Sequence, residues 1–129
     1  MGDTSPAENL RHYKRIKGRG DMLEGLWIVQ YEGTQGEGAG VVVLVRGRVL
    51  GGDMGYTYEG NYVVKDNWMA ASVRVTNFLP NVASVLGTVG NFDLELKAPI
   101  TEGVIRATMS VVGRPGVSVV AKLTKKANL

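Results

Sequence analysis

The sequence predicts an all-β fold, an eight-stranded antiparallel up-and-down β-barrel. From Met22 onward apolar and polar residues alternate with a period of two, and glycine-rich or polar turns interrupt this alternation at short intervals. Almost no window places apolar residues at helical spacing. The chain of 129 residues has the length of one domain, which we expect to span residues 22–129. Two stacked sheets are the alternative, but closure pairs the first and last strands and leaves no Val-rich edge exposed.

The first four predicted strands lie between Leu23 and Val64. Their approximate ranges are 23–33, 40–46, 48–50 and 56–64. In the first strand, Trp27, Val29 and Tyr31 share one face. Residues 33–38 are expected to form a glycine-rich turn, because glycine adopts positive φ without the steric cost of a Cβ. Two consecutive glycines at 51–52 predict a bulge or corner after the third strand.

The last four predicted strands alternate more clearly. They cover about 68–76 and 91–97, a stretch from Gly103 to Val111, and a stretch that follows the turn at 113–116. The longest connection contains Pro80 and allows one short helical turn near residues 80–87. Period-two alternation places these residues inside: Met69, Ala71, Val73, Val75, Phe92, Leu94, Leu96, Ile105, Ala107, Met109, Val111, Val117, Val119, Ala121 and Leu123.

The barrel interior has two possible states, filled or hollow. An eight-stranded barrel is just wide enough to be filled by side chains or to hold one small ligand. Close packing favours a filled core, whereas the many small inward residues favour a cavity. In a hollow barrel, Tyr56, Tyr58 or Tyr62 could orient the polar end of a fatty acid or similar apolar molecule. The candidate interior residues are Trp27, Val29, Tyr56, Tyr58, Met69, Ala71, Val73, Phe92, Leu94, Ile105, Ala107, Met109, Val119 and Ala121.

The net charge of +3 is concentrated at the N-terminus. Residues 1–21 hold five basic and three acidic residues (+2), which leaves ten basic and nine acidic residues (+1) for the rest of the chain. Proteins that grip phosphate backbones usually present a basic face on the folded domain. We therefore expect residues 1–21 to form a basic, flexible arm, and we expect no direct nucleic-acid binding.

The residue types argue against an enzyme. The chain has no Cys and a single His, His12 in the basic arm, which excludes a thiol nucleophile and makes a Ser-His-Asp triad or a zinc site implausible. Asp93 and Glu95 share a polar strand face and are expected to be solvated. No cofactor or metal is expected. The longest apolar run, Val41–Val45, is too short to span a membrane, and no signal peptide is recognisable, so we expect a cytoplasmic protein without membrane insertion.

The start of the first strand is similar to that of lipocalin-like barrels. There a Gly-x-Trp sequence, here Gly25-Leu26-Trp27, places the indole as a plug at the closed end. A basic side chain from the last strand covers it, and Lys122 is the candidate here. An ordinary core tryptophan remains the alternative.

A longer series of segments resembles the GrlR-type family, small Gram-negative bacterial negative regulators of type III secretion genes. The likeness covers roughly residues 23–124. It implies an eight-stranded lipocalin-like barrel that forms a homodimer, has an apolar cavity and sequesters a transcriptional activator. The similar segments are Glu24–Ile28, Gly36–Gly38, Val49–Met54, Tyr58–Gly60, Pro80 followed by Ser84–Leu86, and Ala121–Lys122.

One departure from that family concerns the partner. The family's regulator holds its activator through an acidic loop between the fourth and fifth strands, where this chain has Lys65, Asp66 and Asn67. A near-neutral turn should change or abolish that partner, because charge complementarity governs partner choice. Six apolar residues that break the alternation could form a dimer face: Leu26, Ile28, Val42, Leu44, Val104 and Val120. They could equally lie under the arm or under the long connection. The expected function is therefore regulatory sequestration of a protein, with binding of a small apolar ligand as the alternative.

Overall fold

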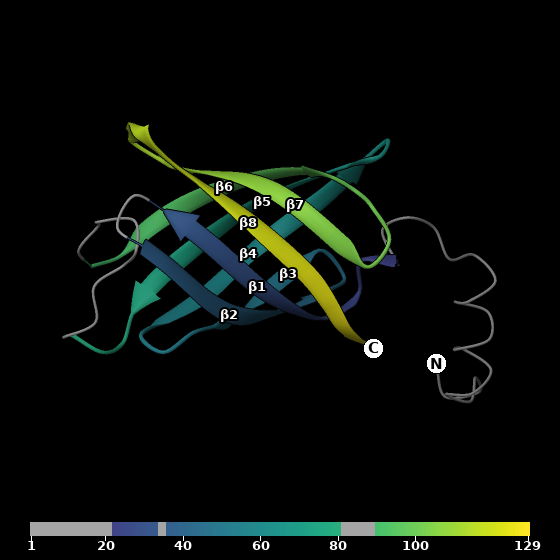
Figure 1. Cartoon of the computed structure of the whole chain (residues 1–129), viewed down its shortest axis with the longest axis horizontal. Coiled ribbons are helices and arrows are strands. Elements are labelled where there is room, and N and C mark those ends of the chain that lie inside the picture. Colours follow the sequence, from purple (N-terminus) through teal and green to yellow (C-terminus); the bar gives the residue numbers. More distant parts are fainter. Residues whose placement is uncertain (1–21, 34–35, 81–89) are drawn as a thin grey trace, which may run out of the picture.

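The computed structural model describes residues 22–33, 36–80 and 90–129 and is all-β, as predicted (Figure 1). The predicted arm, residues 1–21, and nearly all of the helical turn predicted near residues 80–87 lie outside the described residues. No helix in the described part of the chain is long and apolar enough to cross a membrane. The strands are β1 (Gly25–Gly33), β2 (Gly36–Val45), β3 (Arg48–Gly52), β4 (Tyr56–Lys65), β5 (Trp68–Asn77), β6 (Phe92–Pro99), β7 (Val104–Val111) and β8 (Arg114–Asn128).

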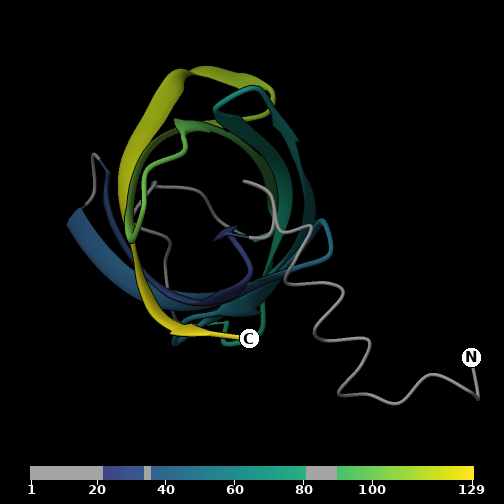
Figure 2. The same ribbon diagram turned by 90° about the vertical axis from the view of Figure 1, so that its right-hand side faces the viewer.

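The eight strands form one closed antiparallel barrel. Each strand pairs with the next along the chain, and β8 pairs with β1, so the sheet has no free edge. Figure 2 shows the strands as a ring seen nearly along its axis. The strands β1, β3, β5 and β7 end, and β2, β4, β6 and β8 begin, at one end of the barrel, which we call the Asp53 end. The other end, where β1 begins, is called the Trp27 end.

The inward faces predicted for β5 to β8 are confirmed. Met69, Ile105 and Leu123 are each at most 3% exposed, and their alternating neighbours on the same strands fill the same core. Val73, Phe92, Leu94 and Val117 are partly buried and pack against that core. Successive residues of these strands face the apolar interior and water in turn, so the alternation in the sequence was enough to predict which face points inward.

Two residues of the predicted dimer face are inside the barrel instead. Val42 and Leu44 are 6% and 2% exposed, and they pair with Trp27 and Gly25 of β1. Paired residues on neighbouring strands share a face, so the inward Trp27 places Val42 inward as well. All five residues from 41 to 45 are apolar, and such a run carries no alternation from which a face can be assigned.

Of the bulge or corner predicted at Gly51–Gly52, the bulge is wrong, because β3 runs regularly through both glycines, and the chain turns directly after them, between Gly52 and Tyr56. A Cβ on Gly51 would lie only 2.0 Å from the carbonyl oxygen of Val41, so the missing side chain permits close strand approach. The irregular registers occur elsewhere, between Leu26 and Trp27 against β8, and near the β7–β8 hairpin. The predicted turn at residues 33–38 is also shorter than expected, since β2 already begins at Gly36.

Trp27 and the last residues of β8 close the Trp27 end. The indole Nε1 donates a hydrogen bond to the carbonyl oxygen of Leu23 at 2.7 Å. Lys125 Nζ lies 5.6 Å from the indole centroid and donates to the carbonyl oxygen of Met22 at 2.6 Å. The basic cover of the indole is thus Lys125. The expected residue, Lys122, alternates with the inward Ala121 and Leu123 and is therefore exposed on the outside. A register shift near Trp27, which the sequence does not reveal, pairs Lys125 with Trp27.

Candidate functional site: an apolar cavity with a Tyr-Asp-Tyr cluster

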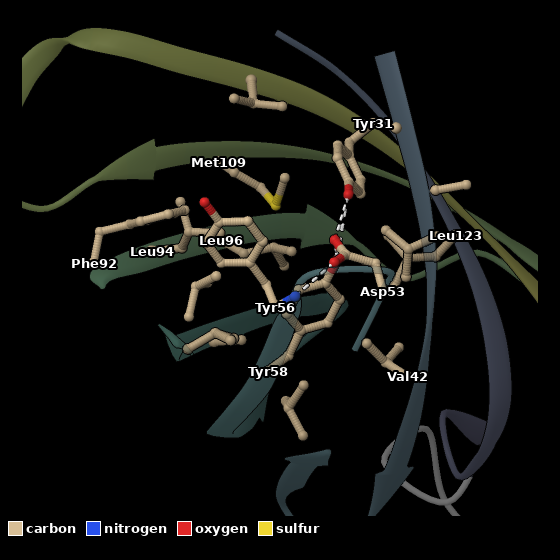
Figure 3. A pocket seen from close by; sticks show the side chains of 18 of the residues that line it. Tyr31, Val42, Asp53, Tyr56, Tyr58, Phe92, Leu94, Leu96, Met109 and Leu123 are labelled. Atoms are coloured by element: carbon tan, nitrogen blue, oxygen red, sulfur yellow. Dashed lines mark hydrogen bonds between the residues drawn. The ribbon is translucent and has the colours of Figure 1, made fainter. Parts of the chain in front are cut away.

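The barrel encloses a cavity of about 380 Å³ whose walls are mostly apolar. Figure 3 shows side chains from strands around the barrel pointing into this space. The filled interior that close packing favoured is therefore not what the structure has. The candidate interior residues that line the cavity are Val29, Tyr56, Tyr58, Met69, Ala71, Val73, Phe92, Leu94, Met109 and Val119.

Four candidate interior residues do not line this cavity. Trp27 and Ile105 are at most 1% exposed and fill the core. Ala107 and Ala121 face each other across β7 and β8 and are buried as well. Tyr62, named as a possible orienting residue, is buried in the core and is also absent from the lining. The open space therefore does not extend to these five side chains.

The polar part of the cavity wall is centred on Asp53, which the sequence analysis did not select. Asp53 lies in the connection between β3 and β4, and its Oδ1 accepts hydrogen bonds from the backbone N–H groups of Gly55 at 3.0 Å and Tyr56 at 2.9 Å. Its Oδ2 accepts from Tyr31 Oη at 2.6 Å and, over a shorter distance, from Tyr58 Oη. We call Tyr31, Asp53 and Tyr58 the Tyr-Asp-Tyr cluster (Figure 3).

The cluster reaches across four neighbouring strands, from β1 to β4, because β2 has no side chains where the phenol rings cross it. Tyr31 belongs to β1 and Tyr58 to β4, with β2 and β3 between them in the sheet. A Cβ on Gly38 would lie 2.5 Å from the Tyr31 ring, and a Cβ on Gly40 would lie 2.9 Å from Tyr58 Oη. These two β2 glycines leave room for the phenol rings, although the sequence predicted only a turn position for Gly38 and a strand start for Gly40.

The hydrogen bonds keep Asp53 ionised. Burial alone raises the pKa of this carboxyl group, but the donors from Tyr31, Tyr58 and the two backbone N–H groups outweigh it and hold the pKa below its usual value of 3.8. At neutral pH, Asp53 is therefore a carboxylate, and a carboxylate can only accept hydrogen bonds.

The two phenols remain protonated for the complementary reason. Burial, together with the hydrogen bond to Asp53, raises the pKa of Tyr31 from 10.0 to about 12. The same two causes raise the pKa of Tyr58 further. Both hydroxyl groups are neutral donors to Asp53 over the whole physiological range.

The cavity wall carries negative but no positive charge in the described part of the chain. Asp53 and Glu37 line it, and no Lys or Arg is among its described lining residues. Across residues 22–33, 36–80 and 90–129, no three His, Asp or Glu side chains gather in a way that could hold a metal ion. What this arrangement can do chemically is enclose an apolar molecule and bind a hydrogen-bond donor at one end.

The predicted partner-binding residues lie far along the barrel from this cluster. Lys65, Asp66 and Asn67 are exposed around the β4–β5 turn at the Trp27 end, and none lines the cavity. Asp66 has a left-handed φ of 56°, and the carbonyl oxygen of Asn67 accepts a hydrogen bond from the Ile100 N–H at 2.7 Å. The β4–β5 turn and the Tyr-Asp-Tyr cluster thus lie at opposite ends of the barrel.

The remaining residues of the predicted dimer face are distributed over the outer surface. Ile28 and Val120 are exposed, whereas Leu26 and Val104 are partly covered. Ile28 pairs with Val41, a residue that was not predicted for this face and is also exposed. The homodimer remains a prediction.

No family model matches the chain, and the search of curated proteins finds no match.

Proposed function

We propose that this protein binds a small apolar molecule inside its barrel. The observation that carries the proposal is the apolar cavity of about 380 Å³ with a polar cluster confined to one end. Its volume falls within the range of about 300–1,000 Å³ typical of small-molecule sites, which are mostly apolar with a few placed polar groups.

Burial of apolar surface would drive the binding. Each 100 Å² of apolar surface removed from water contributes about 2.5 kcal/mol, before the cost of immobilising the ligand is subtracted. The wall contains flexible and aromatic side chains, such as Met69, Met109 and Phe92, that can adapt to a chain or ring. An apolar body with one polar group matches this distribution best.

The proposal is tested by filling the cavity with a larger side chain. Ala71 lines the cavity, while its neighbour Ser72 points outward and is exposed, so Ala71→Phe and Ser72→Phe add the same ring inside and outside one strand. Native mass spectrometry should detect a bound small molecule, or one added from an amphiphile panel, on the wild type and on Ser72→Phe but not on folded Ala71→Phe. Equal loading of both variants, or no thermal shift of the wild type with any panel member, would remove the proposal.

A second candidate function is sequestration of a protein partner, as the GrlR-type resemblance implies. The supporting observation is an exposed apolar patch beside Lys65, Asp66 and Asn67, in which Val63 is 65% and Trp68 is 54% exposed. Tryptophan is enriched at positions that dominate binding energy in protein interfaces. The candidate partner is a transcriptional activator, and this proposal does not require the cavity.

That candidate is tested by comparing capture from a native host lysate by the wild type and by Trp68→Ser. A specific transcription factor retained by the wild type and lost with Trp68→Ser supports sequestration. An outward substitution far from the turn, Glu59→Gln, serves as the control. Failure to enrich any transcription factor or secretion component would remove this candidate and leave the cavity proposal unaffected.

A further inference from the structure

The Tyr-Asp-Tyr cluster presents acceptors, and no free donors, to the cavity. Both oxygens of Asp53 already receive two hydrogen bonds each, from two backbone N–H groups and two phenol hydroxyls. A phenol hydroxyl has one hydrogen, so the donations of Tyr31 and Tyr58 to Asp53 use their donor capacity. The two phenol oxygens are 3.4 Å apart. Each therefore keeps acceptor capacity that the other groups of the cluster do not use up.

The charges at the Asp53 end also favour a ligand group that donates hydrogen bonds. The cluster carries one negative charge on Asp53, and the Glu37 carboxylate also lines the cavity. No described lining residue carries a compensating positive charge. The two internal segments outside the described residues, 34–35 and 81–89, contain no Lys or Arg in their sequence either.

We propose that the ligand is a cationic amphiphile whose ammonium group binds at the Tyr-Asp-Tyr cluster while its apolar body fills the cavity. This inference rests on the proposed function and names its ligand class. An ammonium group supplies hydrogen-bond donors, which the phenol oxygens accept, and a positive charge, which the adjacent Asp53 carboxylate balances.

The same chemistry discriminates against fatty acids, which the sequence analysis had considered. A ligand carboxylate would place its own acceptor oxygens against the phenol lone pairs and a second negative charge beside Asp53, which is partly buried. Polar atoms without partners and like charges in contact are both unfavourable. A neutral alcohol can donate one hydrogen bond, so it is expected to rank between the amine and the acid.

The experiment compares three ligands with one apolar chain: octylamine, octanoic acid and octanol. Their dissociation constants are measured at pH 7 by isothermal titration, on the full chain and below micelle-forming concentrations. The amine is protonated at this pH, since amines of this kind resemble lysine in basicity. We expect octylamine to bind at least about tenfold more tightly than octanoic acid, a difference of about 1.4 kcal/mol.

Asp53→Asn tests the origin of this preference. It should reduce octylamine affinity by about tenfold or more while leaving octanol affinity nearly unchanged, because the apolar cavity remains. Glu59→Gln removes one exposed carboxylate on the outer face of β4 and should change neither affinity, which separates the site from general attraction to an acidic surface. If Asp53→Asn does not fold, Tyr31→Phe provides the second variant, since it removes one acceptor and keeps the carboxylate.

The outcomes separate this inference from the proposed function. Octanoic acid binding as tightly as octylamine, or octanol binding more tightly than octylamine, would overturn the cationic assignment while the cavity still binds ligands. An amine preference that survives in both Asp53→Asn and Tyr31→Phe would also overturn it. Absence of binding by all three ligands would count against the proposed function itself.

Discussion

Replacement of Tyr58 by Phe removes one of the two phenol donors to Asp53 in the Tyr-Asp-Tyr cluster. The substitution keeps the ring against the cavity and removes only the hydroxyl that donates to Asp53. A hydrogen bond to a charged group contributes about 1.5–3 kcal/mol, and Tyr58 is only partly buried, so we expect a loss near 2 kcal/mol. For a domain of this size, such a loss lowers Tm by about 8 °C.

A double-mutant cycle shows whether the loss comes from the Asp53 contact. Asp53→Asn, Tyr58→Phe and the double variant are compared with the wild type by urea denaturation followed by intrinsic fluorescence. If the two groups stabilise each other, the double variant loses less than the sum of the single variants, by about 1 kcal/mol or more. The m-value should be the same for the wild type and the three variants, because the substitutions should not change the surface area that becomes exposed on unfolding.

Strict additivity of the two substitutions would refute this reasoning. It would mean that the hydroxyl and the carboxylate contribute independently and that their contact has no energetic weight. Tyr31→Phe is a useful comparison, because its hydroxyl donates to the same Asp53 oxygen at 2.6 Å. We expect a similar but smaller coupling for it, since Tyr58 remains as a donor.

Three further predictions concern other parts of the barrel. Gly60→Ala should cost about 1–3 kcal/mol, because its Cβ would lie 2.0 Å from a carbonyl oxygen of β5, whereas Gly116→Ala, with open space around it, should be nearly neutral in the same denaturation assay. Lys125→Met should destabilise the fold by about 1 kcal/mol and alter indole fluorescence, while Lys122→Met should do neither. The pKa of Tyr31 is raised from 10.0 to about 12, so folding retains its proton. The stability associated with Tyr31 is complete below pH 10 and is lost as pH rises toward 12. Tyr31→Phe should show a smaller loss than the wild type when denaturation midpoints are compared across that range, because Tyr58, whose pKa is also raised, still contributes to it.

Much of the fold could be predicted from the sequence because most strands are half-buried. Strand β7 alternates strictly between inward apolar and outward polar residues, so both its face and its limits were nearly correct. The face of β2 could not be assigned from its continuous apolar run, since only pairing with the inward Trp27 determines that Val42 points inside. The end of β8 was missed because a register shift interrupts alternation before Asn128.

The candidate site was predictable only in its apolar part. Inward alternation found Val73 and Met109, but it cannot tell whether small residues leave a hollow or let neighbours pack closer. Asp53 follows two glycines and fits an ordinary turn, so its role depends on contacts with Tyr31, which lies 22 positions earlier in the chain. Long-range contacts of this kind leave no local pattern in one sequence.

The passage of β2 beneath the Tyr-Asp-Tyr cluster has a kinetic consequence. Because Gly38 and Gly40 contribute no side chains there, the two phenol rings occupy the space above β2 and form part of the cavity wall at the Asp53 end. The groups that would hold a ligand's polar head are thus the same groups that narrow this end. A ligand leaving that way would break its head-group contacts before its apolar body moved, so the strength of those contacts would set its residence time more than its rate of arrival.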